Sequence, residues 1–455
     1  MGENLSNVLR TCVHSIQSGE AQSPSNKEAL TQCLRTYALI DQTGEAEKII
    51  SEDLLAPFIN KTITQPTLSE QTHTQRNGTN GVPQRHLVIM YNHIITFIEA
   101  NCRALINVTQ KELKGTNYDI PVNCIWDVTT QAILKHSKTI LPLVNADGFH
   151  RNFMDTMDFV SKIEELCGSR RSLIRLRAHP NYQAIMKGWQ LPAYFQLRFR
   201  EISTVVEDAL QLSVDNLPKI PGVDEHLPSS TAVIRAVERC WSSDVYVYGI
   251  AYSFWKLTLQ ILARYTVWVS ANVARVTDSA KERPALSRSS SPAPGSSGSI
   301  NSRQTGRSTP APASLRPTGP VGRNTLEDQM LQQLTLIAGD IDHVAQKIQE
   351  AMEQQIRPKL PPSFTDEPVL QESFEQGIQA IQQELPGIQQ RVAALLIRRC
   401  VDALVNVKTF TSRYGEGPPK EPSQFVTQIL EPLSQYIVGP GATLKSAVRD
   451  ECAME

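Results

Sequence analysis

Apolar residues recur along most of the chain at the spacing of an amphipathic helix. In the segment 191–214, five of them are spaced four, three, four and four residues apart: Phe195, Phe199, Ile202, Val206 and Leu210. This spacing places all five on one helical face. The segment 324–356 repeats the pattern from Met330 to Met352, which predicts one amphipathic helix packed on its neighbours.

The same periodicity predicts further helices and hardly any strand. They are expected over 4–18, 26–41, 44–63, 85–113, 121–141, 147–167, 231–276, 367–385, 388–412 and 423–436. The best strand candidate is the alternating run Val245–Tyr248, and a long helical pattern surrounds it. The chain is therefore predicted to be all-α, and within 231–276 we expect Trp255, Leu259 and Leu262 to be buried.

One tract breaks the helical pattern and divides the chain. Residues 277–323 are rich in Ser, Pro, Gly and Arg, with seven basic against two acidic residues, a net charge of +5. Such a tract has almost no apolar anchors and is expected to be disordered. It would link a helical body, 1–276, to a smaller helical bundle, 324–455. Its Ser291-Pro292 and Thr309-Pro310 pairs make Ser291 and Thr309 candidate phosphorylation sites.

Charge and cysteine content narrow the function classes. The 455 residues carry 45 Lys and Arg against 46 Asp and Glu, a net charge of −1, which argues against a nucleic-acid partner. The eight cysteines are scattered with no CxxC pair, as is typical of a reducing compartment. The apolar run 245–269 is interrupted by Lys256 and Arg264, so a buried helix is favoured over a membrane span.

Catalytic signatures are missing from the sequence. It contains no HExxH, GxSxG or GxGxxG, and the lookalike phosphate loop 439–446 has Leu444 where the second glycine is required. We therefore expect no enzyme activity, no catalytic residue, no cofactor and no metal. A site built from dispersed residues stays open as an alternative.

A basic run at 170–177 has two interpretations. Arg170, Arg171, Arg175 and Arg177 alternate with Leu173, Ile174 and Leu176. The run could contact anionic lipid headgroups or an acidic partner. It could equally be the solvated face of an amphipathic helix, which is the plainer interpretation.

Five strings, in order, carry a family resemblance. They are CLRTYALID at 33–41, MDFV with CGS at 157–169, RLRAHP at 175–180, LPAYFQLRFREI at 191–202 and WKLTLQILARY at 255–265. Together they resemble the second-subunit family of the conserved oligomeric Golgi complex. The resemblance is good over about 28–276 and weaker, though collinear, beyond the tract 277–323.

This resemblance implies a non-catalytic vesicle tether built from stacked helical bundles that form an elongated rod. The function implied is intra-Golgi retrograde transport, Golgi organisation and maintenance of the glycosylation enzymes. The partners implied are the sibling subunits of a hetero-oligomer, Rab GTPases, SNAREs and golgins, at the cytoplasmic face of Golgi membranes and in the cytosol. No catalytic residue is carried over from the family.

Two further expectations follow from the same comparison. Relative to the family, the chain is expected to start downstream of a long N-terminal region and to stop inside the C-terminal unit. The alternative function is a generic all-helical scaffold or adaptor outside the Golgi. In that case the five strings are short sequences that are common in helices of unrelated proteins.

Overall fold

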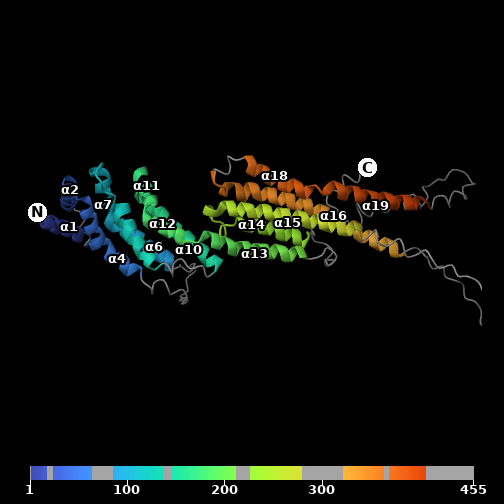
Figure 1. The fold of residues 1–455 in the computed structure, drawn as a ribbon, viewed down its shortest axis with the longest axis horizontal. Coiled ribbons are helices and arrows are strands. Elements are labelled where there is room, and N and C mark those ends of the chain that lie inside the picture. The colour runs from blue at the N-terminus through green and yellow to red at the C-terminus, as the bar shows by residue number, and fades with distance from the viewer. Residues whose placement is uncertain are drawn as a thin grey trace, which may run out of the picture. The chain divides into compact units, whose positions relative to one another are not determined.

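The computed structural model describes residues 2–17, 24–63, 86–136, 145–211, 226–278, 321–362 and 368–405. All secondary structure in these ranges is helical, so the predicted all-α class is confirmed for them. The chain forms two compact units, Met1–Arg198 and Phe199–Glu455. Each unit is described by itself below, and Figure 1 labels the helices of both.

The first unit is a layered set of mostly short helices, several of which run into one another without a break. Their bounds are α1 Gly2–Gln17, α2 Pro24–Leu39, α3 Thr43–Ile49, η2 Ile50–Leu55, α4 Ala56–Thr62, α6 His86–Phe97, η3 Ile98–Cys102, α7 Arg103–Asn107, η4 Val108–Glu112, η5 Ile120–Trp126, α8 Asp127–Lys135, α10 Ala146–Leu166, α11 Arg170–Ala178, α12 Pro180–Gly188 and the start of α13, Leu191–Gln211. The predicted segments 44–63 and 85–113 are continuous helical runs, interrupted only by the π-helical turns η2, η3 and η4.

Helix α12 is the element that the periodicity did not predict. Pro180 reads as a helix breaker, but here it occupies the first turn, where its missing N–H has no intrahelical partner anyway. His179 precedes it in an extended conformation, and its Nδ1 accepts a hydrogen bond from the backbone N–H of Asn181 at 3.3 Å.

A buried arginine ties α13 to α10 inside the first unit. Arg198 is only 1% exposed. Its Nε donates to the hydroxyl of Tyr194 at 3.1 Å, and its Nη2 donates to Asp147 Oδ1 at 2.5 Å. The guanidinium thereby keeps charge-assisted partners where water is excluded, as a buried charge requires.

The second unit is a bundle of longer helices lying side by side (Figure 1). It comprises the rest of α13, α14 Pro228–Cys240, η7 Tyr248–Ile250, α15 Ala251–Asp278, α16 Val321–Ala351, η8 Met352–Ile356, η9 Arg357–Lys359, α18 Pro368–Gln382 and α19 Leu385–Val405. Helix α15 packs on α18 and α16, and α14 packs on α16. Helices from both sides of the tract 277–323 thus share one compact unit.

Residues 279–320 and 406–455 lie outside the described ranges. The predicted disorder of 277–323, its role as a domain boundary and the helix expected at 423–436 therefore stay predictions. At the edges of the tract, α15 continues to Asp278 and α16 begins at Val321, so those few residues are helical.

The predicted helix 231–276 is wrong in its middle. Trp241 to Val245 form turns after α14, Val247 is extended, and a short 3-10 turn leads into α15. The strand candidate Val245–Tyr248 does not form a strand either. Val245 and Val247 are buried, so their alternation reflects two apolar side chains inserted into the core. Trp241 stabilises the interruption between α14 and α15, because its indole N–H donates to Thr258 Oγ1 at 3.0 Å.

Two of the three core positions expected in α15 are confirmed. Trp255 and Leu262 are 2% and 0% exposed, whereas Leu259 is only half-buried, so that part of the prediction was wrong. At about 100° per residue, Leu259 stands roughly 100° from buried Thr258, at the margin of the buried face. Lys256 and Arg264 lie on the exposed face. Within the described residues, no helix has the length and apolarity to span a membrane.

The cysteines are packed as small apolar groups rather than paired. The seven in the described ranges are all free thiols, and five of them are buried. Burial raises the pKa of Cys102 and of Cys240 to about 12. Cys12 and Cys400 are partly exposed.

Candidate functional site

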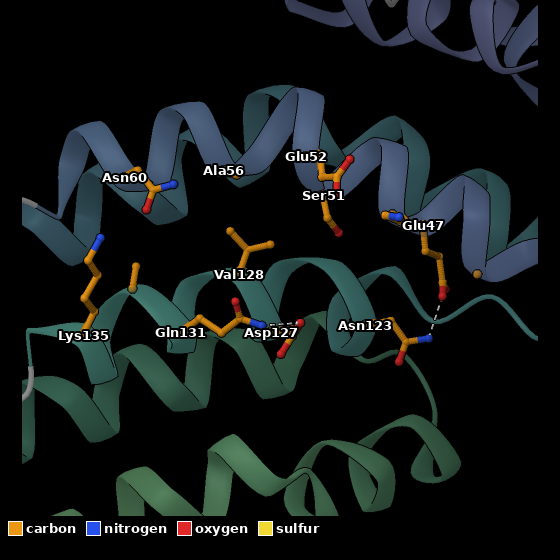
Figure 2. Close-up of a pocket in the computed structure, with 13 residues that line it drawn as sticks. Glu47, Ser51, Glu52, Ala56, Asn60, Asn123, Asp127, Val128, Gln131 and Lys135 are labelled. Carbon is orange, nitrogen blue, oxygen red and sulfur yellow. Dashed lines mark hydrogen bonds between the residues drawn. The ribbon is translucent and has the colours of Figure 1, made fainter.

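A groove of about 640 Å³ runs along two parallel helical segments of the first unit (Figure 2). One wall is the continuous run α3–η2–α4, and the other is η5–α8. The lining residues are mostly small or carry amide or charged groups: Gly44, Glu47, Lys48, Ser51, Glu52, Ala56, Asn60, Asn123, Asp127, Val128, Gln131, Ala132 and Lys135.

The π-helical turn η2 gives the first wall its shape. In a regular α-helix, Ala56 would stand about 120° away from Gly44 around the axis, since twelve residues separate them. A π-helical turn accommodates an extra residue and so takes out about 100° of that rotation. Gly44, Ser51 and Ala56 therefore all line the groove.

Glu47 closes one end of the groove by joining its two walls (Figure 2). Its Oε1 accepts from the backbone N–H of Asp119 at 2.7 Å, and its Oε2 accepts from Asn123 Nδ2 at 2.8 Å. Burial raises the pKa of Glu47, an effect that these two hydrogen bonds only partly oppose. The carboxylate thus serves as a fixed structural link.

The network continues from Glu47 to helix α11. Asp119 is 6% exposed, and its Oδ1 accepts from Ser172 Oγ at 2.6 Å. Its Oδ2 lies 3.4 Å from Arg175 Nη1. These contacts connect α11 to the Glu47 end of the groove and use one of its four arginines.

Asp127 holds α12 against the second wall. Its Oδ1 accepts from Asn181 Nδ2 at 2.9 Å, and its Oδ2 accepts from Gln131 Nε2 at 2.9 Å. The acids Glu47 and Asp127 are therefore engaged by fixed partners. Among the residues that the structure describes, no group of three His, Cys, Asp or Glu could hold a metal ion.

The basic run forms helix α11, as its periodicity indicates. Ser169 caps it, accepting from the backbone N–H of Ser172 at 3.2 Å. Arg177 makes a two-pronged pair with Glu164, at 2.8 and 2.7 Å, which holds the pKa of that carboxyl below its usual range. Arg170 and Arg171 are exposed at the start of the helix.

The predicted phosphorylation sites Ser291 and Thr309 lie outside the described residues and stay predictions. The groove, in contrast, was not predicted from the sequence. Small residues at 44, 51 and 56 do not share a face on a regular helix, so their common role becomes visible only once η2 is known. The sequence offered no signal for that turn.

The described fold is that of an all-α protein of packed helices whose candidate site is a groove between two helical segments. The chain belongs to the family described as COG complex component, COG2, C-terminal, whose model matches residues 187–455.

Relatives match beyond that range as well. Over 444 residues the chain is 30% identical to the Homo sapiens protein named conserved oligomeric Golgi complex subunit 2, covering 94% of this chain and 56% of the relative. The Arabidopsis thaliana protein of the same name is 26% identical over 92% of this chain and 50% of its own length. The Drosophila melanogaster one is 29% identical over 57% and 36%.

The chain therefore spans about half the length of the first two relatives. No solved structure matches it significantly. The family confirms the resemblance stated on the five strings.

Proposed function

We propose that this chain is a non-catalytic subunit of a Golgi vesicle-tethering complex, the conserved oligomeric Golgi complex. It would act in intra-Golgi retrograde vesicle transport and thereby in Golgi organisation and the maintenance of glycosylation enzymes. The observation that carries this proposal is the 30% identity over 94% of the chain to a protein named as subunit 2 of that complex.

The proposed partners are the sibling subunits of the complex, together with Rab GTPases, SNAREs and golgins. The proposed location is the cytoplasmic face of Golgi membranes, as a peripheral protein, with a cytosolic pool. Phosphorylation of Ser291 and Thr309 would change the charge of the basic tract between them and is proposed as a point of regulation.

The groove along α4 and α8 supports a docking role. Its lining includes the short side chains of Ser51, Ala56 and Ala132, which leave room for a third helix to approach closely. Amide and charged groups at Asn60, Asn123 and Lys135 offer hydrogen bonds along its length. A helix from a sibling subunit would bury both walls at once.

The test is affinity capture of the tagged full-length protein at mild salt, with partners identified by mass spectrometry. Sibling tether subunits recovered in near-equal amounts are the expected result. Recovery of none from a folded, abundant bait, with no Golgi localisation, refutes the proposal and favours a helical scaffold outside the Golgi.

A pair of variants tests the groove in the same experiment. Ala56→Trp places a large side chain in the groove, and Ala274→Trp places one on the exposed face of α15 as a control. We expect Ala56→Trp alone to lower recovery of one or more siblings at unchanged helical circular dichroism. Equal recovery with both variants would remove the groove from the interface while leaving the family function in place.

A further inference from the structure

Helix α11 presents an unusual solvent face. Its buried side carries Ser172 and Leu176, which point into the first unit. At about 100° per residue, the side away from these two carries Arg170, Arg171, Ile174, Arg177 and Ala178, all exposed. Arg175 is exposed too, but it stands on the flank of the buried side. The nine-residue helix contains no acidic residue, and Ile174 in the middle of the arginines is 58% exposed.

The charges that face these arginines come from the elements packed against α11. Asp119, ahead of η5, pairs with Arg175, and Glu164 at the end of α10 pairs with Arg177. Exposed Glu165 also lies near the end of α10. A further element near α11 is η4. Gln110 Nε2 donates to the backbone oxygen of Leu166 at 2.8 Å, which brings the end of η4 to the α10–α11 turn.

The two ion pairs offset the charges of Arg175 and Arg177, but the helix has no acidic residue of its own and stays net positive. Asp119 and Glu164 lie at its base, with side chains 6% and 18% exposed, whereas Arg175 and Arg177 are 44% and 57% exposed. The acids therefore orient the guanidinium groups while the outer surface remains basic. No acidic residue in the first turn offsets Arg170 and Arg171. Lys111 in η4 and Lys114 just after it are exposed as well, and exposed Glu112 between them pairs with Lys27.

We propose that the outward face of α11, consisting of Arg170, Arg171, Ile174 and Arg177, docks on an anionic lipid bilayer surface. Guanidinium groups such as those of Arg170 and Arg171 bind headgroup phosphates and carboxylates in a forked geometry, whereas the fork of Arg177 is used by Glu164. Ile174 enters the boundary between headgroups and acyl chains, as apolar residues of interfacial helices do. The proposal deepens the tethering function proposed above, on which it rests, by naming the surface that meets the membrane.

Two features favour a bilayer over an acidic protein segment. The face is the outward side of a helix that rests on the first unit, which suits a planar layer of headgroups more than a single peptide. An exposed isoleucine ringed by arginines also matches the two components of interfacial binding, apolar insertion and electrostatic attraction.

The test is co-sedimentation of the purified 455-residue chain with vesicles of phosphatidylcholine alone or enriched in phosphatidylserine. Binding to the anionic vesicles only is expected, with loss in molar salt, where the screening length falls to about 3 Å. Arg170→Ala with Arg171→Ala removes two cations and should weaken partitioning roughly thirtyfold. Ile174→Asp should weaken it as well.

Arg35→Ala with Arg103→Ala is the matched control, since both residues are exposed on other helices of the first unit. It makes the same change in net charge and should leave binding nearly unchanged. An equal loss with the control, no binding of the parent chain at low salt, or binding to polyglutamate but not to vesicles would each overturn the proposal. Because the purified chain is used alone, failure here is distinguishable from failure to capture sibling subunits.

Discussion

Leu262 and Gly377 allow the packing between α15 and α18 to be tested as a pair. Leu262 is 0% exposed, and a Cβ built on Gly377 would lie 3.3 Å from Leu262 Cδ1. The leucine thus fills the space that a side chain at 377 would occupy. Replacing either residue changes what the other position can accept.

The magnitudes follow from this contact. Leu262→Ala should cost about 3 to 5 kcal/mol, the loss of apolar transfer free energy plus a cavity. Gly377→Ala gains about 1 kcal/mol of helix propensity in the interior of α18. In the parent protein the tight approach to Leu262 offsets this gain, so the single variant should be close to neutral.

In the Leu262→Ala background the obstacle is gone. The new methyl group then keeps the propensity gain and fills part of the cavity, adding up to about 0.8 kcal/mol. The double-mutant cycle should therefore show a coupling free energy of about 1 kcal/mol or more, of stabilising sign.

The assay is guanidinium unfolding followed by circular dichroism at 222 nm for all four proteins of the cycle. Leu259→Ala serves as the control, with a smaller loss of about 1 to 2 kcal/mol, because that side chain is already in contact with water. If Gly377→Ala has the same effect with and without Leu262, the two side chains do not compete for space and the packing argument fails.

Three further predictions concern buried polar groups. The pKa of Glu47 is raised above its ordinary value, so the stability that its protonation contributes is present below pH 4.5 and is lost as pH rises through the raised pKa. Glu47→Gln should flatten the pH dependence of the unfolding free energy over that window, as measured by urea titrations at several pH values. Asp340 is 0% exposed and accepts from the backbone N–H of Leu227 at 2.6 Å. Asp340→Ala should lower the free energy of unfolding by about 1 to 3 kcal/mol, measured by denaturant titration, and a near-zero change would show that the site rearranges. Arg198→Met should also lower the free energy of unfolding by about 1 to 3 kcal/mol. It leaves Asp147 solvated, since that carboxylate is 58% exposed, and an unchanged free energy of unfolding would mean that Arg198 contributes no net stability.

Helix content was largely predictable from the sequence, because amphipathic periodicity reports burial directly. The segment 147–167 matches α10, Ala146–Leu166, within a residue at each end. The errors arise where tertiary contacts override the pattern. The hydrogen bond from Trp241 to Thr258 stabilises turns within a segment whose sequence pattern is continuously helical. No glycine–proline pair lies nearby to indicate this interruption.

The candidate surfaces differ in how far the sequence indicated them. The arginines of α11 were visible as a basic helical face, but their internal pairs with Asp119 and Glu164 join positions 56 and 13 residues apart and could not be read from local spacing. The groove depends on the π-helical turn η2, which changes which side chains share a face. Its walls also come from segments far apart in the sequence.

The burial of most cysteines has a practical consequence for labelling. Cys33, Cys102, Cys124, Cys167 and Cys240 are shielded from reagents in the folded protein. Cys12 in the first unit and Cys400 in the second are partly exposed, so they should react first under mildly alkaline conditions. With Cys452 replaced by serine, the chain would then carry one fluorophore position in each unit. Single-molecule energy transfer between the two dyes could then follow the distance between the units when vesicles or partner proteins are added, without any engineered cysteine.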